Sequence, residues 1–358
     1  TNTYNIAIGY TAGGAVTTGV QNTLIGGLAG DAITDGNNNI AIGKSALSAT
    51  QTGDQSVAVG SFALEAQVGN GAMNNTAVGY AAGNAITTGV ENTLIGGLAG
   101  DALTDADFNV ALGAGALGAD TLGSRSTAVG YLSLFNQNFT SATNSNNTAI
   151  GYAAGTAVTT GDRNTLIGSQ AGDTITTGIA NVIIGFGCDV ATGGVGNSIV
   201  IGEAVGAVGG NNFTFGNGSL DSNIAFGATS ITAPSDERMK KDIETSTAGL
   251  SFINDLRPVT YKWKKEKDIV NTLDAYVEGS DKKVINDTTN HGFIAQEVKT
   301  AIDNHSEIKD GFDMWMEKDS DGQQRVAPSA LIPILTKAIQ EQQALIESLT
   351  TRIETLEG

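Results

Sequence analysis

The residues best suited to chemistry lie in one short stretch, A-P-S-D-E-R-M-K-K-D-I at residues 233–243. The hydroxyl of a serine such as Ser235 is a weak nucleophile until a base removes its proton. A lysine such as Lys240 can be that base where burial or nearby positive charge lowers its pKa, and Arg238 and Lys241 lie close in sequence. The stretch also suits an ordinary helix start, with Ser235 as the N-cap and acidic residues in the first turn.

The composition of the chain changes at this stretch. The 358 residues carry a formal charge of −18, from 37 acidic and 19 basic side chains. The part before Ser235 holds 42 of the 48 glycines and only three basic residues, whereas the remainder is an ordinary charged sequence. We therefore expect two domains, residues 1–234 and residues 235–358.

Charge and hydropathy exclude several classes of partner. A chain this acidic repels nucleic acid and anionic membrane surfaces, and it has no apolar run long enough for membrane insertion. The single Cys188 rules out an intrachain disulfide framework and suits a small buried hydrophobe. His291 and His305 have no cysteine partner and no H-x-x-x-H spacing, so we expect no metal and no cofactor. Because the chain starts at Thr1 without a signal peptide, we expect a fragment or a processed piece.

Residues 1–234 are built on a short motif, N-T-x-I-G or a close variant, whose glycine recurs at a nearly constant spacing. A longer repeat overlies it, because residues 80–105 nearly copy residues 10–35. A strict short period is the sequence signature of a stacked solenoid. The motif occurs as NIAIG at 5–9, NTLIG at 22–26, NTAVG at 75–79, NTLIG at 92–96, NTAIG at 147–151 and NTLIG at 164–168, with variants between them.

The motif favours thin, mostly β coils of roughly 17 residues, the usual interval between motif glycines. T-x-I alternates its side chains between the two faces of a short strand, the glycine permits a turn at positive φ, and T-T-G or L-A-G supplies a second corner. We expect two short strands and two turns in each coil, with an asparagine ladder from coil to coil. The core of so thin a coil is a file of Ile, Leu, Val and Ala, so we expect neighbouring chains to complete it. A trimeric β-roll or interleaved β-helix satisfies these requirements.

The coils resemble the heads of trimeric autotransporter adhesins and the shafts of bacteriophage tail fibres over roughly residues 1–230. The longest insertion, at 131–147, concentrates aromatic residues in a region that is otherwise poor in them. If Tyr131, Phe135 and Phe139 are exposed, they can contact a receptor or a sugar. The alternative is a buried plug between subunits.

Residues 235–358 resemble the endosialidase-type intramolecular chaperones, which are auto-cleaving C-terminal domains of phage tail spikes and fibres. S-D-E-R-M-K-K-D-I at 235–243 is similar to the family's S-D-x-R-L-K-x-x-I signature. L-S-F-I-N-D-L-R-P-V-T-Y-K-W-K at 250–264 resembles its helix and following strand, and H-G-F-I-A-Q-E-V at 291–298 resembles a third segment. A long C-terminal helix, at about 328–357, completes the pattern.

The resemblance implies a self-cleaving serine-lysine peptidase that acts once on its own chain, with no turnover. Ser235 is then the nucleophile, Lys240 the base and Pro234–Ser235 the scissile bond. Asp236 and Arg238 position the loop. His291 packs or hydrogen-bonds near it.

The C-terminal helix carries an apolar heptad pattern that predicts a coiled coil. Ile at a with Leu at d favours a parallel dimer on intrinsic preference, whereas the stem and the family favour three chains. The alternative is an amphipathic helix packed on its own domain. The heptad positions are Ile332, Leu335, Ile339, Ile346, Leu349, Ile353 and Leu356, with Gln342 interrupting the series.

Three functions are compatible with these observations. The first is a homotrimeric phage tail fibre, assembled in the host cytoplasm and carried on the virion, with a host-surface receptor or polysaccharide and other virion tail proteins as partners. Its C-terminal domain drives trimerisation and folding and then cuts itself away. The second is a bacterial trimeric surface adhesin. The third is a sugar-degrading tailspike with an inter-chain site, for which no close carboxylate pair stands out in the sequence.

Overall fold

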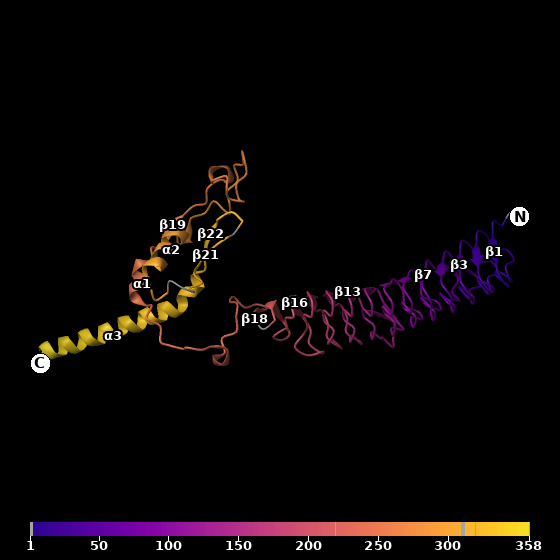
Figure 1. Cartoon of the computed structure of the whole chain (residues 1–358), viewed down its shortest axis with the longest axis horizontal. Helices are drawn as coiled ribbons and strands as arrows, with labels where there is room; N and C mark the ends of the chain where they lie inside the picture. Colours follow the sequence, from indigo (N-terminus) through magenta and orange to yellow (C-terminus); the bar gives the residue numbers. More distant parts are fainter. Residues whose placement is uncertain (1–2, 219, 309–311, 319, 358) are drawn as a thin grey trace. The chain divides into compact units, whose positions relative to one another are not determined.

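The structure is a computed structural model in which the chain divides into two compact units, Thr1–Asp236 and Glu237–Gly358. It describes residues 3–218, 220–308, 312–318 and 320–357. The first unit is a β-solenoid and the second is a small α+β unit that ends in a long helix (Figure 1). The predicted fold class, a solenoid of short, regular coils followed by a helical α+β unit, is confirmed.

The solenoid stacks one short strand from each coil into a single sheet, with fourteen strands among the described residues. All neighbouring pairs are parallel except the last, β17 with β18, which closes the stack as an antiparallel hairpin. The strands are β1 (Ile6–Ile8), β2 (Thr23–Ile25), β3 (Ile40–Ile42), β5 (Val57–Val59), β7 (Thr76–Val78), β8 (Thr93–Ile95), β9 (Val110–Leu112), β11 (Thr127–Val129), β13 (Thr148–Ile150), β14 (Thr165–Ile167), β15 (Val182–Ile184), β16 (Ser198–Glu203), β17 (Asn212–Asn217) and β18 (Leu220–Ala225).

The expectation of two strands in every coil is wrong for the ordinary coils. Outside the strand the chain turns repeatedly, through left-handed residues such as Glu91 and Leu98 as well as glycines. These turns take up most of the residues outside the strand. Among the described residues, a second strand forms only where an ordinary coil adjoins one that adds residues: β4 (Gly53–Asp54) pairs with β6 (Gly71–Ala72) of one long coil, and β10 (Gly123–Ser124) pairs with β12 (Thr143–Asn144) of the other.

The predicted asparagine ladder is present and buried. The backbone N–H of Asn22 donates to Oδ1 of Asn5 (2.8 Å), and that of Asn39 donates to Oδ1 of Asn22 (2.9 Å). The Asn22 amide also donates to the carbonyl of Gly36, at the next corner (2.8 Å). Each asparagine therefore satisfies backbone groups inside the coil that no water reaches.

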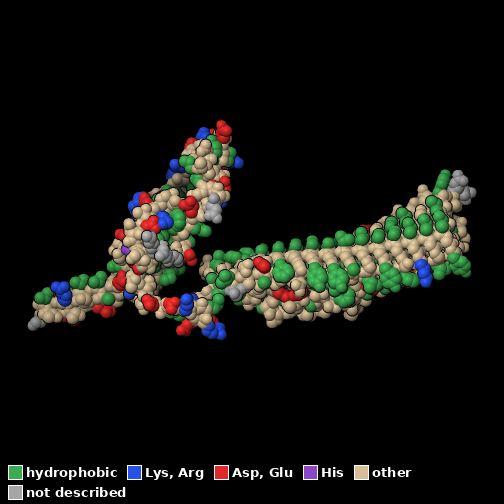
Figure 2. Space-filling model, viewed as in Figure 1, with side chains coloured by type: hydrophobic (Ala, Val, Ile, Leu, Met, Phe, Trp, Pro, Cys, Tyr) green, Lys and Arg blue, Asp and Glu red, His purple; other side chains and the backbone are tan. Residues whose placement is uncertain are grey.

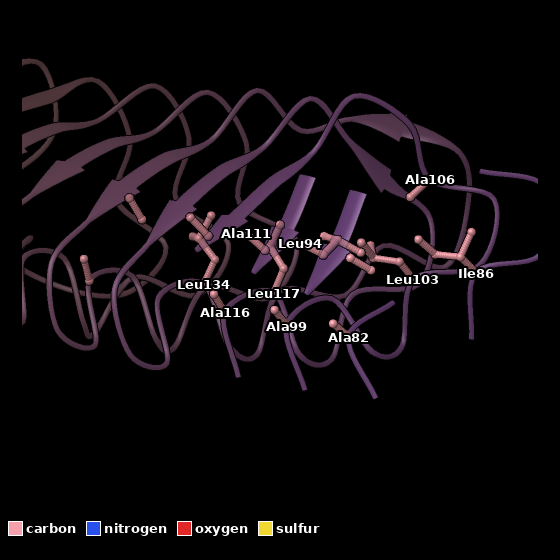
Figure 3. Packing of buried hydrophobic residues seen from close by; sticks show 14 of the residues in the cluster. Ala82, Ile86, Leu94, Ala99, Leu103, Ala106, Ala111, Ala116, Leu117 and Leu134 are labelled. Carbon is pink, nitrogen blue, oxygen red and sulfur yellow. The ribbon is translucent and has the colours of Figure 1, made fainter. Parts of the chain in front are cut away.

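Two of the inward positions of each coil have sizes that compensate one another in most coils of the solenoid. One is the middle residue of the strand and the other is the fourth residue after the motif glycine. In one coil the strand position holds the large Leu94 and the other position holds Gly100, where an added Cβ would lie 2.8 Å from Leu94 Cδ2. In the next coil the strand position holds the small Ala111 and the other position holds the large Leu117 (Figure 3). These apolar side chains are fully buried within one chain, contrary to the expectation that neighbouring chains are needed to complete the core.

The residue just before the motif glycine points outward, and it is apolar in every coil from β1 to β16. The exposed fractions reach 60% for Ile8, 44% for Leu112 and 39% for Ile150. We call this column the outer stripe; Figure 2 shows hydrophobic side chains in rows along the stem. The outer stripe comprises Ile8, Ile25, Ile42, Val59, Val78, Ile95, Leu112, Val129, Ile150, Ile167, Ile184 and Ile201.

The second unit contains two short helices, two small antiparallel sheets and the long helix α3 (Leu331–Glu357); α1 packs against α3, and α2 packs against α1 and one of the sheets. Its core includes Phe252, Val298, Met314 and Ile334. The elements are η1 (Glu237–Met239), α1 (Leu250–Asp255), β19 (Val259–Tyr261), η2 (Glu266–Asp268), β20 (Asn290–Gly292), α2 (Ala295–Asn304), β21 (Trp315–Glu317), β22 (Gln324–Val326) and η3 (Pro328–Ala330).

Helix α3 uses two different faces. Leu331, Ile334 and Ala338 are buried in the unit, and the Glu341 carboxylate accepts the backbone N–H of Leu250 at 2.8 Å. The predicted heptad residues are exposed along the whole helix, including its first turns. They are Ile332, Leu335, Ile339, Ile346, Leu349, Ile353 and Leu356. The first turns therefore pack on their own domain, as one interpretation predicts, while the coiled-coil face is left uncovered.

A buried histidine joins the ends of α1 and α2. His305 Nε2 lies 2.9 Å from Asp255 Oδ2, and Nδ1 lies 2.8 Å from Glu307 Oε1, while the imidazole packs edge-on to Phe252. Hydrogen bonds to Glu307 and then Asp255 raise the pKa of His305 above its ordinary value, against the opposing effect of desolvation. The two carboxylates therefore favour the protonated form of the His305 imidazole.

We expect Gly26→Ala to lower the stability of the stem by at least about 2 kcal/mol. Gly26 has a φ of +135°, and an added Cβ would lie 2.5 Å from the Gly43 carbonyl oxygen. Its neighbour Gly27 meets nothing within 4 Å, so Gly27→Ala is the matched control and should be neutral or slightly stabilising. Denaturant unfolding followed by circular dichroism measures both. Equal midpoints for the two variants would contradict the coil geometry.

We expect the second unit to lose stability as the pH rises through the raised pKa of the folded His305 imidazole. The folded pKa of His305 exceeds the unfolded value of about 6.5, so its contribution is complete below that value and is lost as the pH rises through the folded pKa. Both tryptophans, Trp263 and Trp315, lie in this unit, so fluorescence reports its unfolding alone. His305→Gln should cost about 2 kcal/mol at low pH and flatten the profile. The exposed His291 supplies the control, His291→Gln, which should keep the wild-type profile.

Candidate functional site

The stretch that contains Ser235 and Lys240 is exposed on the surface. Residues 231–247 are all exposed, and the only helical feature among them is the single 3₁₀ turn η1. The Lys240 N–H donates to the Glu237 carbonyl at 3.0 Å and closes this turn. The α-helix that the N-cap interpretation predicts does not follow Ser235. Each of Ser235, Asp236, Arg238 and Lys240 makes further polar contacts.

Of the remaining residues that the sequence singled out, His291 lies in β20. It pairs with Thr260 of β19 in an antiparallel ladder, and its side chain is exposed. Both ring nitrogens of His305 contact carboxylates, those of Asp255 and Glu307. Among the described residues, no group of three or more His, Cys, Asp or Glu side chains is arranged to hold a metal ion.

The three aromatic residues of the long insertion have different surroundings. Tyr131 is 52% exposed and stacks on Tyr152, with ring centroids 5.7 Å apart and planes 18° from parallel. Phe135 is 37% exposed, whereas Phe139 is only 7% exposed. The burial of Phe139 lies within one chain, and it leaves Tyr131 and Phe135 as the exposed members of the set.

Below this insertion lies a buried polar network that sequence reasoning missed. Ser126 takes the place of an asparagine in the ladder, and Gln137 compensates for it by donating to Ser126 Oγ (3.1 Å) and accepting from Asn147 Nδ2 (2.8 Å). The fully buried Asp120 accepts the N–H of Phe139 at 3.1 Å and a bond from Gln137. Desolvation raises the pKa of the Asp120 carboxyl above its ordinary value. The break in the N-T-x-I-G pattern at Ser126 was the available signal.

Two carboxyl groups do meet on the stem, although the sequence did not single them out. Asp173 interacts with Asp189, one coil further on, and burial followed by this interaction raises the pKa of Asp173. Carboxyl groups that flank a glycosidic bond are separated by about 5 Å or more, so two carboxyl groups in direct interaction do not suit that role. The pair therefore gives no support to a sugar-degrading tailspike. A search for acidic residues one coil apart would have found it.

Among the described residues, no helix is long and apolar enough to cross a membrane. A scan against protein families matched residues 235–307 to the family described as the chaperone of endosialidase, a peptidase family. Comparisons with curated proteins and with solved structures gave no match. The matched segment starts at Ser235, at the end of the solenoid, and contains Lys240, His291 and His305. The chain therefore carries a chaperone of endosialidase domain, a kind of domain known as a self-cleaving intramolecular chaperone, behind a β-solenoid stem.

Proposed function

We propose that the chain is part of a homotrimeric bacteriophage tail fibre whose C-terminal domain assembles the stem and then cuts itself from it. One observation carries the proposal: the solenoid ends at a closing hairpin, and the segment that matches the chaperone of endosialidase family begins shortly after it, at Ser235. The family's association with trimeric phage fibres favours this reading over a bacterial adhesin. Virion location, a host receptor and other tail proteins as partners belong to the same proposal.

The proposed reaction takes place at Pro234–Ser235. The Ser235 hydroxyl attacks the Pro234 carbonyl carbon, and Lys240 accepts the hydroxyl proton. The C–N bond breaks as the new ester bond forms, and the departing Ser235 nitrogen takes up a proton. Water then hydrolyses the ester, which gives one chain that ends at Pro234 and another that begins at Ser235. Asp236 and Arg238 position the loop.

The exposure of the seam favours cleavage after assembly. A lysine acts as a base when its ammonium is moved out of water, and residues 231–247 are exposed in the single chain. Association of three chains supplies the missing burial. The cut then follows folding, and the completed stem is separated from the domain that built it, which makes the stem kinetically difficult to unfold.

Two uncovered apolar faces support the trimer. The outer stripe runs along the parallel stack, and the heptad face runs along α3. Both repeat at the spacing of their own element, and a parallel, in-register assembly of identical chains covers both. An exposed apolar column of this length is otherwise a liability in a single chain.

We expect Ser235→Ala to abolish cleavage and Lys240→Ala to slow it at least about 100-fold, the scale of general-base catalysis. Intact mass measured under denaturing conditions should show fragments 1–234 and 235–358 for wild type and the uncut chain for Ser235→Ala. Lys282→Ala is the control, because it removes an exposed ammonium of the same unit outside this stretch and should leave cleavage unchanged. If Ser235→Ala still yields both fragments, the nucleophile is misassigned. A folded wild-type trimer that is never cut contradicts the self-cleavage proposal.

We expect Leu112→Lys to prevent stable trimer formation. The substitution places three ammonium groups on the covered face, where unpaired charge is costly. Val68 is also an exposed apolar residue of the stem, at 52%, but lies away from the outer stripe, so Val68→Lys is the matched control and should trimerise normally. Sedimentation velocity distinguishes the two variants. A trimeric Leu112→Lys stem would show that the outer stripe is not the interface.

A further inference from the structure

A notch on the side of the stem spans three successive coils at 97–135. It has a volume of about 300 Å³. That volume lies at the lower end of the range for small-molecule sites and suits a single ring-sized group. The lining residues are Gly97, Leu98, Asp101, Ala114, Gly115, Gly118, Tyr131, Leu132 and Phe135.

The notch exists because the middle coil carries only small side chains. Ala114, Gly115 and Gly118 form its floor, between coils that carry larger residues on either side. A Cβ on Gly118 would lie 3.0 Å from the Phe135 ring, and one on Gly115 would lie 2.8 Å from Leu132. At Gly97, by contrast, an added Cβ meets nothing within 4 Å, so this part of the notch is open.

The two walls of the notch differ in chemistry. One wall is aromatic, with Phe135 partly exposed and Tyr131 held in place by its stack on Tyr152. The other wall carries Asp101, a half-buried carboxylate that has no salt-bridge partner among the described residues. Partial burial raises the pKa of this carboxyl above its ordinary value.

The same place in the preceding copy of the longer repeat, four coils earlier, can be compared with the notch. There the middle coil has Lys44, Ser45 and Ser48 in place of Ala114, Gly115 and Gly118. The Lys44 ammonium lies 5.2 Å from the centre of the Phe62 ring, so its side chain extends toward the next coil. The second repeat has lost this cation and gained aromatic side chains at Tyr131 and Phe135, where the first has Ser61 and Glu65.

We propose that the notch binds one neutral pyranose ring of a glycan, an inference that rests on the proposed host-recognition function of the fibre. A pyranose has an apolar C–H face that packs on an aromatic ring, and an edge of hydroxyl groups that donate to a carboxylate. The ligand is neutral because residues 1–234 carry fourteen acidic and three basic side chains, which repel sialic acids and phosphorylated sugars. Phe135 and Tyr131 supply the stacking surface, and Asp101 accepts the hydroxyl hydrogens.

Saturation-transfer NMR on the full-length trimer tests the proposal, with D-glucose, D-galactose and N-acetyl-D-glucosamine as neutral probes and N-acetylneuraminic acid as the anionic comparison. At least one neutral sugar should receive saturation, and the anionic one should not. Ala114→Lys restores the side chain of the earlier repeat and should reduce the signal at least tenfold. Gly97→Leu fills the open part of the notch and should have the same effect. Ser169→Lys, which places a lysine at the same position of a distant coil, should leave binding unchanged.

The outcomes separate this site from the fibre function. A wild-type trimer that binds no neutral sugar, or binds the anionic one better, overturns the notch proposal. So does undiminished binding by Ala114→Lys and Gly97→Leu. Sedimentation and intact mass on the same samples report trimerisation and cleavage independently. A chain that trimerises and cuts itself but binds no sugar therefore refutes only the proposal that the notch binds a sugar. A chain that binds sugar but stays an uncut monomer refutes the proposed fibre function and leaves the sugar-binding proposal intact.

Discussion

The stem depends on one constraint: each polar group inside a coil must meet its equivalent in the next coil. Asn22 illustrates it, because one amide side chain accepts a backbone N–H from the following coil and donates to a carbonyl at the following corner. The ladder asparagines from Asn22 onward are fully buried, so an amide without a partner there would be left unsatisfied. Every other property of the stem, including strand length, turn positions and core size, has to be compatible with this stacking.

The constraint explains which parts of the stem were predictable. The short period, the ladder and the turn glycines repeat in the sequence, so each is visible many times over. Gln137 and the Asp173–Asp189 contact occur where the pattern is locally broken, and their partners are identified only when the coils are stacked. The number of strands was misjudged because ordinary residues such as Glu91 and Leu98 adopt left-handed conformations that the sequence pattern does not reveal.

In the C-terminal unit, the sequence predicted the local motifs but not the buried contacts. The motif around Ser235 and the heptads of α3 were recognisable, since one is a local signature and the other is periodic. The buried contacts were not, because His305 meets Asp255, which is distant in sequence. The sequence also did not show which apolar side chains of α3 are exposed. In the structure, one face of α3, which includes Leu331 and Ile334, is buried within the domain, and the heptad face is left for other chains.

The two long coils have a consequence for how such a fibre changes length during evolution. The chain makes four coils from Gly9 to Gly79 and four more from Gly79 to Gly151, although the second block is slightly longer in sequence. The extra residues fall in the coil that contains β12, and the main stack continues in register beyond them. Length along the axis is therefore counted in coils of about 4.8 Å, not in residues. Duplicating a four-coil block extends the stem by about 19 Å without disturbing its register, while small insertions alter only the side of the rod.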